Sequence, residues 1–203
     1  MGLRERRERE QETLRRKILD AAREMFVEEG YHSVSMRRIA QRIEYSPTTI
    51  YLYFKDKAAL FNSLCEETFA KLDARLGALS RRHQDDPLAF MREGLRGYIE
   101  FGLKHPHHYA ITFILQPPEF EQRPFEESAG KRAFDHLPRA VEVCVAAGVF
   151  RPGLDVAATA QSLWAAAHGV TSLLIGHGEG FPFVAKRKLI DQTVDTMLRG
   201  LRP

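Results

Sequence analysis

Residues 46–57, SPTTIYLYFKDK, place hydroxyl, ammonium and aromatic groups together on one short stretch. Hydroxyl and ammonium groups can donate hydrogen bonds to the phosphate oxygens of a nucleic acid. The methyl groups of Leu52 or Thr48 can pack against the methyl group of thymine in the major groove. A core helix would not carry so many hydroxyls, and a solvated face has no need of three aromatic residues and a leucine. The stretch therefore favours a partner, and duplex DNA fits its chemistry.

The same residues predict a helix with two different faces. Ser46 is a favourable N-cap and Pro47 a favourable first residue, so we expect a helix that ends near Phe54. Ile50 and Phe54 are four residues apart and define the inner face. At about 100° per residue, four side chains point outward, and two more flank them. The outward residues are Thr48, Tyr51, Leu52 and Lys55, and the flanking ones are Thr49 and Tyr53.

Positive charge is concentrated in the same part of the chain. The net charge is +3, and residues 1–57 carry the whole excess, with 13 Lys and Arg against 10 Asp and Glu. The densest part is an arginine-rich arm at residues 4–9. Such an arm points to nucleic acid, although a solvated tail remains an alternative. The predicted DNA-binding residues are Arg37, Ser46, Pro47, Thr48, Thr49, Tyr51, Leu52, Tyr53, Lys55 and Lys57.

Helical periodicity fills the chain between its proline and glycine residues, and neither strand alternation nor an internal repeat occurs. The sequence therefore predicts an all-α fold. We expect N-caps at Ser35, Ser46, Asp56, Asp86 and Asp155, and a bend or break at Pro138. The expected helices cover roughly residues 14–29, 35–43, 46–54, 56–79, 86–104, 106–115, 125–147, 155–176 and 183–199.

The composition indicates a globular protein of the cytoplasm. Of the 203 residues, 44% are hydrophobic and 28% charged, which argues against disorder. No secretory signal opens the sequence, and no apolar run reaches the roughly 20 residues of a membrane span. Cys65 and Cys144 lie in apolar helical patterns without the spacing of a metal site, so we expect buried, reduced thiols.

The segment from Phe26 to Phe61 resembles the DNA-binding domain of the TetR (tetracycline-repressor-like) family of transcriptional regulators. The matching elements are Phe26-x-x-x-Gly30, Ile39-Ala40, Ser46, Thr49, Ile50-Tyr51, Tyr53-Phe54, Lys57 and Leu60-Phe61. The resemblance implies a three-helix DNA-binding domain at residues 1–57 and a helical ligand-binding and dimerisation domain at 58–203. It also implies an obligate homodimer that leaves its operator DNA when a small molecule binds.

One position departs from the family pattern. The family often has glycine in the turn between the second and third helices, where this chain has Glu44. A left-handed conformation would cost a glutamate about 1–2 kcal/mol. We therefore expect this turn to adopt a slightly different conformation.

The C-terminal part offers a candidate ligand pocket. Residues 164–169, WAAAHG, resemble a signature of the WHG-type class of C-terminal domains in the same family. Aromatic walls with a few polar groups are typical of small-molecule pockets, and they predict an apolar or aromatic effector. A plain core role remains the alternative for each residue. The candidates are Phe113, Gln116, Phe120, Trp164 and His168.

Two C-terminal helices carry a candidate dimer interface. Small residues recur at threes and fours along the helix that begins at Asp155, which allows close approach of another helix. Paired with the last helix and their symmetry mates, they would form a four-helix interface. The predicted interface residues are Ser162, Ala165, Gly169, Ser172, Ile190, Val194 and Met197.

The sequence gives little support to catalysis or metal binding. His105, His107 and His108 lack a partnering cysteine or carboxylate at a fixed helical offset. Phosphate-binding loops, nucleophile elbows and HExxH motifs do not occur in the sequence, so we expect neither an enzyme nor a cofactor. The prediction is a homodimeric, ligand-responsive DNA-binding regulator, with a repressor favoured. The alternatives are a helical small-molecule-binding protein without DNA binding and a small helical enzyme.

Overall fold

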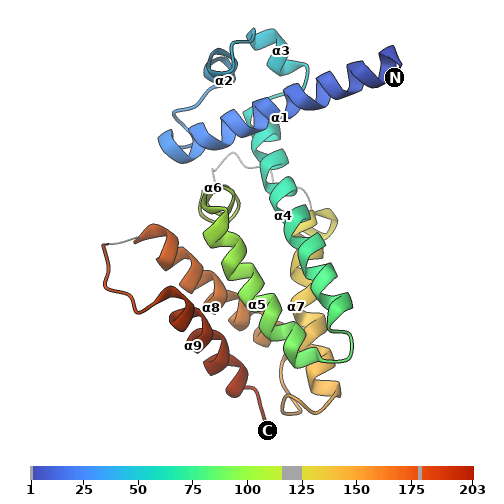
Figure 1. The fold of residues 1–203 in the computed structure, drawn as a ribbon, viewed down its shortest axis with the longest axis vertical. Helices are drawn as coiled ribbons and strands as arrows, with labels where there is room; N and C mark the ends of the chain where they lie inside the picture. Colours follow the sequence, from blue (N-terminus) through green and yellow to red (C-terminus); the bar gives the residue numbers. More distant parts are fainter. Residues whose placement is uncertain (1, 116–124, 178–179) are drawn as a thin grey trace. The chain divides into compact units, whose positions relative to one another are not determined.

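A computed structural model describes residues 2–115, 125–177 and 180–203, with only the backbone at Leu3 and Phe125. The predicted all-α fold is confirmed, because the described part of the chain is helical and holds no strand (Figure 1). The elements are α1 (Leu3–Glu29), α2 (Met36–Arg42), α3 (Pro47–Tyr51), α4 (Lys57–Arg82), α5 (Pro87–Lys104), α6 (Pro106–Tyr109), the π-helix η1 (Ala110–Ile114), the 3-10 helix η2 (Phe125–Glu127), α7 (Ala129–Ala146), α8 (Val156–Gly176) and α9 (Lys186–Arg199).

The predicted N-caps set the starts of five helices. In each case a side-chain oxygen accepts a hydrogen bond from the backbone N–H three residues further on, which satisfies a donor that the helix itself leaves unpaired. The donor–acceptor distances lie between 2.7 and 3.3 Å. The capping residues are Ser35, Ser46, Asp56, Asp86 and Asp155.

The arginine-rich arm is helical rather than extended. Helix α1 begins at Leu3, well before the predicted start at about residue 14. Arg4 pairs with Glu8 at 3.1 Å and Arg6 with Glu10 at 2.9 Å. Pairs of this i,i+4 spacing stabilise a helix by about 0.2–0.5 kcal/mol each. The glutamates between the arginines thus help to extend α1 toward the N-terminus.

Two other helices also depart from their predicted limits. Helix α3 ends at Tyr51 rather than near Phe54, because the N–H groups of Leu52 and Tyr53 bond to carbonyls three residues back and tighten the chain. Helix α7 runs through Pro138 to Ala146, so the proline does not break it.

The chain packs as two compact units. The first holds residues 2–68 and 107–115, and the second holds residues 69–106, 125–177 and 180–203. Helix α4 therefore contributes residues to both units, and the expected boundary after residue 57 falls inside the first.

The core of the first unit joins α1 to the two helices that follow it. Ile18, Ala22 and Phe26 lie at threes and fours on α1 and are fully buried. An aromatic cluster closes one end, since the ring centroids of Phe26 and Tyr31 lie 5.7 and 5.3 Å from that of Phe61. Burial of these side chains holds α2 and α3 in a fixed position on α1.

The second unit is a bundle around α5 and α8. Helix α5 contacts α7, α8 and α9, and α8 also contacts α7 and α9 (Figure 1). Met91, Leu95 and Ile99 give α5 its buried stripe, and Leu163 and Leu174 are buried on α8. Helix α8 therefore has one face in the core of this unit and the opposite face exposed.

The turn between α2 and α3 corrects one expectation. Glu44 does adopt the left-handed conformation, with φ of 63°, where a different conformation had been expected. The N–H of Tyr45 bonds to the carbonyl of Ala40 at 2.9 Å and that of Glu44 to Gln41 at 3.2 Å. These two bonds form a Schellman motif, which requires a left-handed residue at this position. The hydrogen bonds therefore hold a glutamate in a conformation better suited to glycine.

Glu44→Gly should stabilise the protein. Relief of the left-handed strain of about 1–2 kcal/mol exceeds the entropic cost of a glycine, about 0.5–1 kcal/mol, so the free energy of unfolding should rise by up to about 1 kcal/mol. Urea unfolding followed by circular dichroism measures the change. Gln41→Gly, at an exposed position inside α2, is the control and should destabilise by about 1 kcal/mol. A decrease in stability for Glu44→Gly would contradict the expectation.

Candidate nucleic-acid interface

Helix α3 and the turn after it, residues 47–55, have the two faces expected from the spacing, and the exposed one is the outer face of α3. Ile50 is fully buried and Phe54 is 4% exposed, against the core of the first unit. On the other side Leu52 is 79% and Tyr51 53% exposed, although both carry large apolar groups. Exposed apolar side chains of this size favour an interaction site over simple solvation. Thr48 and Lys55 are also exposed, and Thr49 and Tyr53 are half-buried.

The start of α3 carries two more of the predicted contact residues, Ser46 and Pro47. The hydroxyl oxygens of Ser46 and Thr49 lie 2.8 Å apart, and the same Ser46 oxygen accepts the N–H of Thr49 at 3.2 Å. The Ser46 hydroxyl therefore caps α3, and both hydroxyls retain capacity for a further hydrogen bond. Pro47 is exposed at the first helical position, where its missing N–H costs nothing.

Two neighbouring arginines on α2 behave differently. Arg38 pairs with Glu29 at 2.6 Å and donates to the carbonyl of Ser33 at 2.8 Å. Arg37 is exposed and forms no ion pair with any residue that the structure describes. Its guanidinium group is therefore the one of the two that can reach an external anion without losing an internal partner.

Lys57 has a structural role that the sequence did not indicate. Its ammonium group donates to the carbonyls of Tyr31 and Val34, both at 2.9 Å. It also lies 4.1 Å from the centroid of the Tyr31 ring. Lys57 thus ties the start of α4 to the segment between α1 and α2. A phosphate contact by Lys57 stays a prediction, and it would use the one remaining donor of the ammonium group.

Lys57→Met should destabilise the protein by about 1–3 kcal/mol, because two partly buried carbonyl groups lose the ammonium donor and that of Tyr31 keeps only the N–H of Val34, at 3.3 Å. Lys55→Met is the matched control. Its ammonium group is exposed and lies 3.9 Å from Asp56, so its loss should change stability by less than about 0.5 kcal/mol. Urea unfolding of both variants tests the difference, and equal stabilities would show that the two carbonyls do not depend on Lys57.

The predicted pocket residues are divided between the two units. Phe113 belongs to the first unit, where its ring centroid lies 4.9 Å from that of Tyr109. Trp164 and His168 belong to the second unit, with ring centroids 5.8 Å apart. Gln116 and Phe120 lie outside the described residues. Within the second unit, the structure brings Trp164 and His168 together.

These two residues form part of a hydrogen-bonded chain between α5 and α8. Trp164 donates to the hydroxyl of Tyr98 at 3.2 Å, and that hydroxyl lies 3.4 Å from Nδ1 of His168. The other ring nitrogen of His168 lies 3.3 Å from Oγ of Ser172. Burial lowers the pKa of His168 below its ordinary value of 6.5, which favours the neutral ring. A neutral ring, with one donor and one acceptor nitrogen, suits both contacts.

The predicted dimer residues fall into two groups. Ser162 and Ala165 are exposed on α8, and Gly169 and Ser172 are half-buried further along the same helix. On α9, Met197 is half-buried, whereas Ile190 and Val194 are only 8% and 2% exposed in the single chain. Ile190 and Val194 therefore pack in the core of their own protomer. Among the predicted dimer residues, those on α8 provide most of the exposed surface.

Comparison with known proteins places this geometry in a family. Residues 18–64 match the model of bacterial regulatory proteins of the tetR family. Residues 91–199, more than half of the chain, match the model of the tetracyclin repressor-like C-terminal domain. The chain belongs to the TetR family. The resemblance found in the sequence between Phe26 and Phe61 is confirmed, and the narrower WHG-type class of the C-terminal domain stays a prediction.

Individual members of the TetR family support the same assignment. The chain is 43% identical over 115 residues to the HTH-type transcriptional repressor Rv1474c of Mycobacterium tuberculosis, which is 57% of this chain and 58% of that protein. It is 44% identical over 55 residues to the HTH-type transcriptional regulator UidR of Escherichia coli, or 27% of this chain and 28% of that protein. The chain thus spans less than two thirds of the length of either curated relative.

A solved structure matches over nearly the whole chain. A protein of unknown function from Rhodococcus sp. RHA1 has a TM-score of 0.77 and 26% identity, with 94% of this chain and 96% of that chain covered. The fold of this chain thus has a counterpart over almost the full length of another protein. No helix among the described residues is both long and apolar enough to span a membrane.

Sequence reasoning missed two residues beside α3 in this TetR-family chain. Tyr45 immediately precedes Ser46 and is 42% exposed. Lys17, one helix earlier, donates to the carbonyl of Ile43 at 3.1 Å and lies 5.3 Å from the Tyr45 ring centroid. The signal for Tyr45 was present, since a tyrosine in a short turn between two helices rarely has enough core to cover it. The role of Lys17 depends on its hydrogen bond to the carbonyl of Ile43, 26 residues later in the sequence. Helical periodicity gives no indication of such a tertiary contact.

Proposed function

We propose that this TetR-family chain is a homodimeric transcriptional repressor that binds a palindromic operator and leaves it when a small molecule binds. The observation that carries the proposal is the outer face of α3, where Leu52 is 79% exposed beside exposed Thr48 and Lys55. The apolar side chain of Leu52 can contact a base edge in the groove, while the hydroxyl of Thr48 and the ammonium group of Lys55 can contact backbone phosphates. The relatives named as repressor and regulator support the same reading of the helix-turn-helix.

A mobility-shift assay with the DNA upstream of the chain's own gene tests the proposal. The logarithm of the affinity should fall linearly with the logarithm of the salt concentration. Leu52→Ala or Thr48→Ala should change the preference for one base pair, by about 1–3 kcal/mol. Lys55→Ala should instead weaken all sequences alike and reduce the salt slope by about 0.9 per phosphate contact. Failure to bind any duplex would favour the alternative, a small-molecule-binding protein without DNA binding.

The dimer is proposed to form through the exposed face of α8 together with α9. Ser162 and Ala165 are exposed there, and Leu173, further along α8, is 46% exposed. Small side chains let two symmetry-related helices approach closely, and the exposed leucine adds apolar area that a partner can cover. Ile190 and Val194 support this surface from within the protomer, because they hold α9 in place.

The release of DNA is proposed to operate through α4, which both compact units share. Two heads read DNA when their separation matches about one helical turn, roughly 34–36 Å, or a multiple. An effector can change this separation only if it binds one arrangement of the heads more tightly than the other. The predicted effector is apolar or aromatic, with Trp164 and His168 of the second unit among its contacts. Calorimetric titration of the effector with and without operator DNA tests the coupling, because the two ligands must weaken each other by the same factor.

A further inference from the structure

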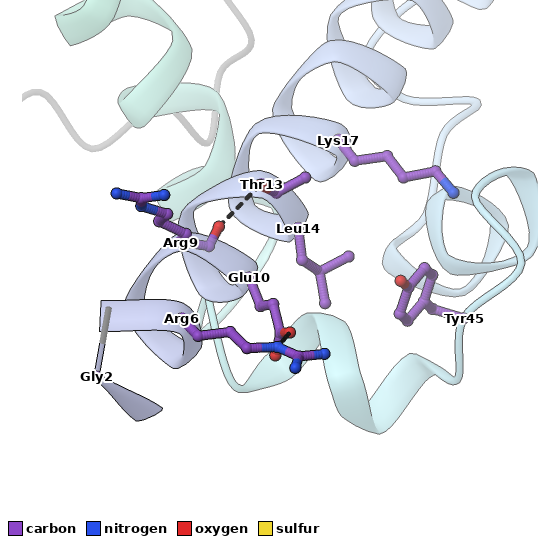
Figure 2. Close-up of a pocket in the computed structure, with 8 residues that line it drawn as sticks. All are labelled: Gly2, Arg6, Arg9, Glu10, Thr13, Leu14, Lys17 and Tyr45. Atoms are coloured by element: carbon purple, nitrogen blue, oxygen red, sulfur yellow. Dashed lines mark hydrogen bonds and ion pairs between the residues drawn. The ribbon is translucent and has the colours of Figure 1, made fainter. Parts of the chain in front are cut away.

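A groove of about 550 Å³ lies beside the recognition helix of the first unit (Figure 2). One wall is the N-terminal part of α1, and the other is Tyr45, the residue before the N-cap of α3. The groove is lined by Gly2, Arg6, Arg9, Glu10, Thr13, Leu14, Lys17 and Tyr45. Its position next to α3 means that a duplex seated on α3 passes close to it.

The lining has an apolar floor and cationic edges. Figure 2 shows the side chains of Arg6, Leu14 and Lys17 on the side of α1 that faces Tyr45, whereas the guanidinium group of Arg9 points the other way. Leu14 lies between the two cations on the helix, at the level of the Tyr45 ring. The Tyr45 hydroxyl and the Arg6 guanidinium group are thus donors on opposite walls of the same groove.

Lys17 holds the Tyr45 wall in position. Its ammonium group donates to the carbonyl of Ile43 at 3.1 Å and lies 5.3 Å from the centroid of the Tyr45 ring. The first contact fixes the end of α2, and the second favours the ring in that place by a cation–π interaction. Lys17 is therefore a positioning residue for Tyr45, and its charge adds to the positive potential of the groove.

The segment of α1 that forms the other wall is exposed to solvent. Every described side chain from Arg4 to Thr13 is exposed. Residues 4–17 carry seven Arg and Lys against four Glu, an excess of three positive charges. An isolated helix of this length is marginal in water, so a helix that projects in this way gains most from a partner along its side. The charge makes an anionic partner the complementary one.

We propose that this groove receives a backbone phosphate of the DNA that flanks the base pairs read by α3. The Arg6 guanidinium and the Tyr45 hydroxyl are its donors, and Lys17 orients the tyrosine. Glu10 opposes the binding, because it pairs with Arg6 at 2.9 Å and places a carboxylate in the groove. The inference rests on the proposed function, and it adds a contact outside the helix-turn-helix that fixes the register of α3 on the duplex.

The chain contains a matched control for this site. Arg4 and Glu8 form the same type of i,i+4 pair on the same helix, at 3.1 Å, but neither lines the groove. Arg4→Ala and Arg6→Ala thus remove the same charge and the same kind of helix-stabilising pair. Glu8→Gln and Glu10→Gln form a second matched comparison. The far-ultraviolet circular dichroism of the four variants reports any loss of helix in α1.

The test compares two probes by fluorescence anisotropy. One is the shortest duplex that keeps the base pairs read by α3, and the other carries about ten more base pairs, one helical turn, at each end. On the longer probe, Arg6→Ala and Tyr45→Phe should each weaken binding about three- to tenfold. Arg6→Ala should also lower the salt slope by about 0.9 per head. Glu10→Gln should strengthen binding. Arg4→Ala and Glu8→Gln should change it less than about twofold, as exposed surface charges do.

The outcomes separate this inference from the function on which it rests. If the wild type binds no duplex, the proposed function fails, and the inference fails with it. If the wild type binds but Arg4→Ala and Arg6→Ala lose affinity equally, the two arginines act only through their net charge. That result would overturn the proposal of a phosphate site in the groove. Equal losses on the short and long probes would also overturn it, because the contact would then lie within the base pairs read by α3.

Discussion

Ala165→Arg should convert the proposed homodimer into a monomer and lower its operator affinity by about 100-fold or more. Ala165 is exposed in the protomer, on the face of α8 that is proposed to meet a second copy. In the dimer an arginine there would bury an unpaired charge, which costs several kcal/mol. A monomer has one DNA-reading head, so it loses the gain of about 10²- to 10⁴-fold that comes from linking two. Light scattering gives the mass, and fluorescence anisotropy gives the affinity.

The control for this variant is Ala78→Arg. Ala78 is exposed on α4, and an arginine there adds the same side chain away from α8 and α9. It should leave both mass and affinity unchanged. If wild-type protein has the mass of one chain, or if Ala165→Arg remains a dimer with full affinity, the proposed interface on α8 is incorrect. Ile190→Ala does not test the interface in the same way, because this side chain is 8% exposed and its loss would disturb the protomer itself.

The parts of the fold that are determined by residues close together in the sequence were predictable. The caps at Ser46 and Asp155 and the inner face with Ile50 follow from residues within one or two helical turns. The outer face of α3 was predictable for the same reason. Its short length was not predicted, since the helix ends at Tyr51 and the N–H groups of Leu52 and Tyr53 bond to carbonyls three residues back.

Other features were not predictable because distant residues determine them. Glu44 is left-handed because the Schellman bonds and the buried faces of α2 and α3 leave no other path, and this packing outweighs a local preference. The ammonium group of Lys57 donates hydrogen bonds to the carbonyls of Tyr31 and Val34, which lie more than 20 residues earlier in the sequence. A lysine beside a recognition helix reads as a phosphate ligand in the sequence, and only the tertiary contacts show that its ammonium group already has partners.

The last large effect concerns a charged network that joins α1 to α4 within the first unit. Glu67 accepts from Arg16 at 2.7 Å and lies 3.4 Å from Arg23. Asp20 contacts the same two arginines, at 3.3 and 2.6 Å. Arg23 is only 7% exposed, so its charge depends on these carboxylates. Under the proposed function, this network would pass a movement of α4 to α1, which supports α2 and α3.

Glu67→Gln should therefore lower the free energy of unfolding by about 2–3 kcal/mol, because it leaves a buried guanidinium group with one carboxylate in place of two. Urea unfolding measures the loss. Glu28→Gln, an exposed change on α1, should cost less than about 0.5 kcal/mol.

A second variant separates unpaired charge from lost packing. If the buried charge of Arg23 causes the loss, the double variant Arg23→Met with Glu67→Gln should be more stable than Glu67→Gln alone, since a methionine fills the space without needing a carboxylate. If the double variant is instead less stable than Glu67→Gln, packing rather than charge holds α1 on α4. A loss no greater than that of Glu28→Gln would show that the network contributes nothing, and the movement of α4 would then have to reach the DNA-reading helix through the buried apolar contacts of Phe26 and Phe61.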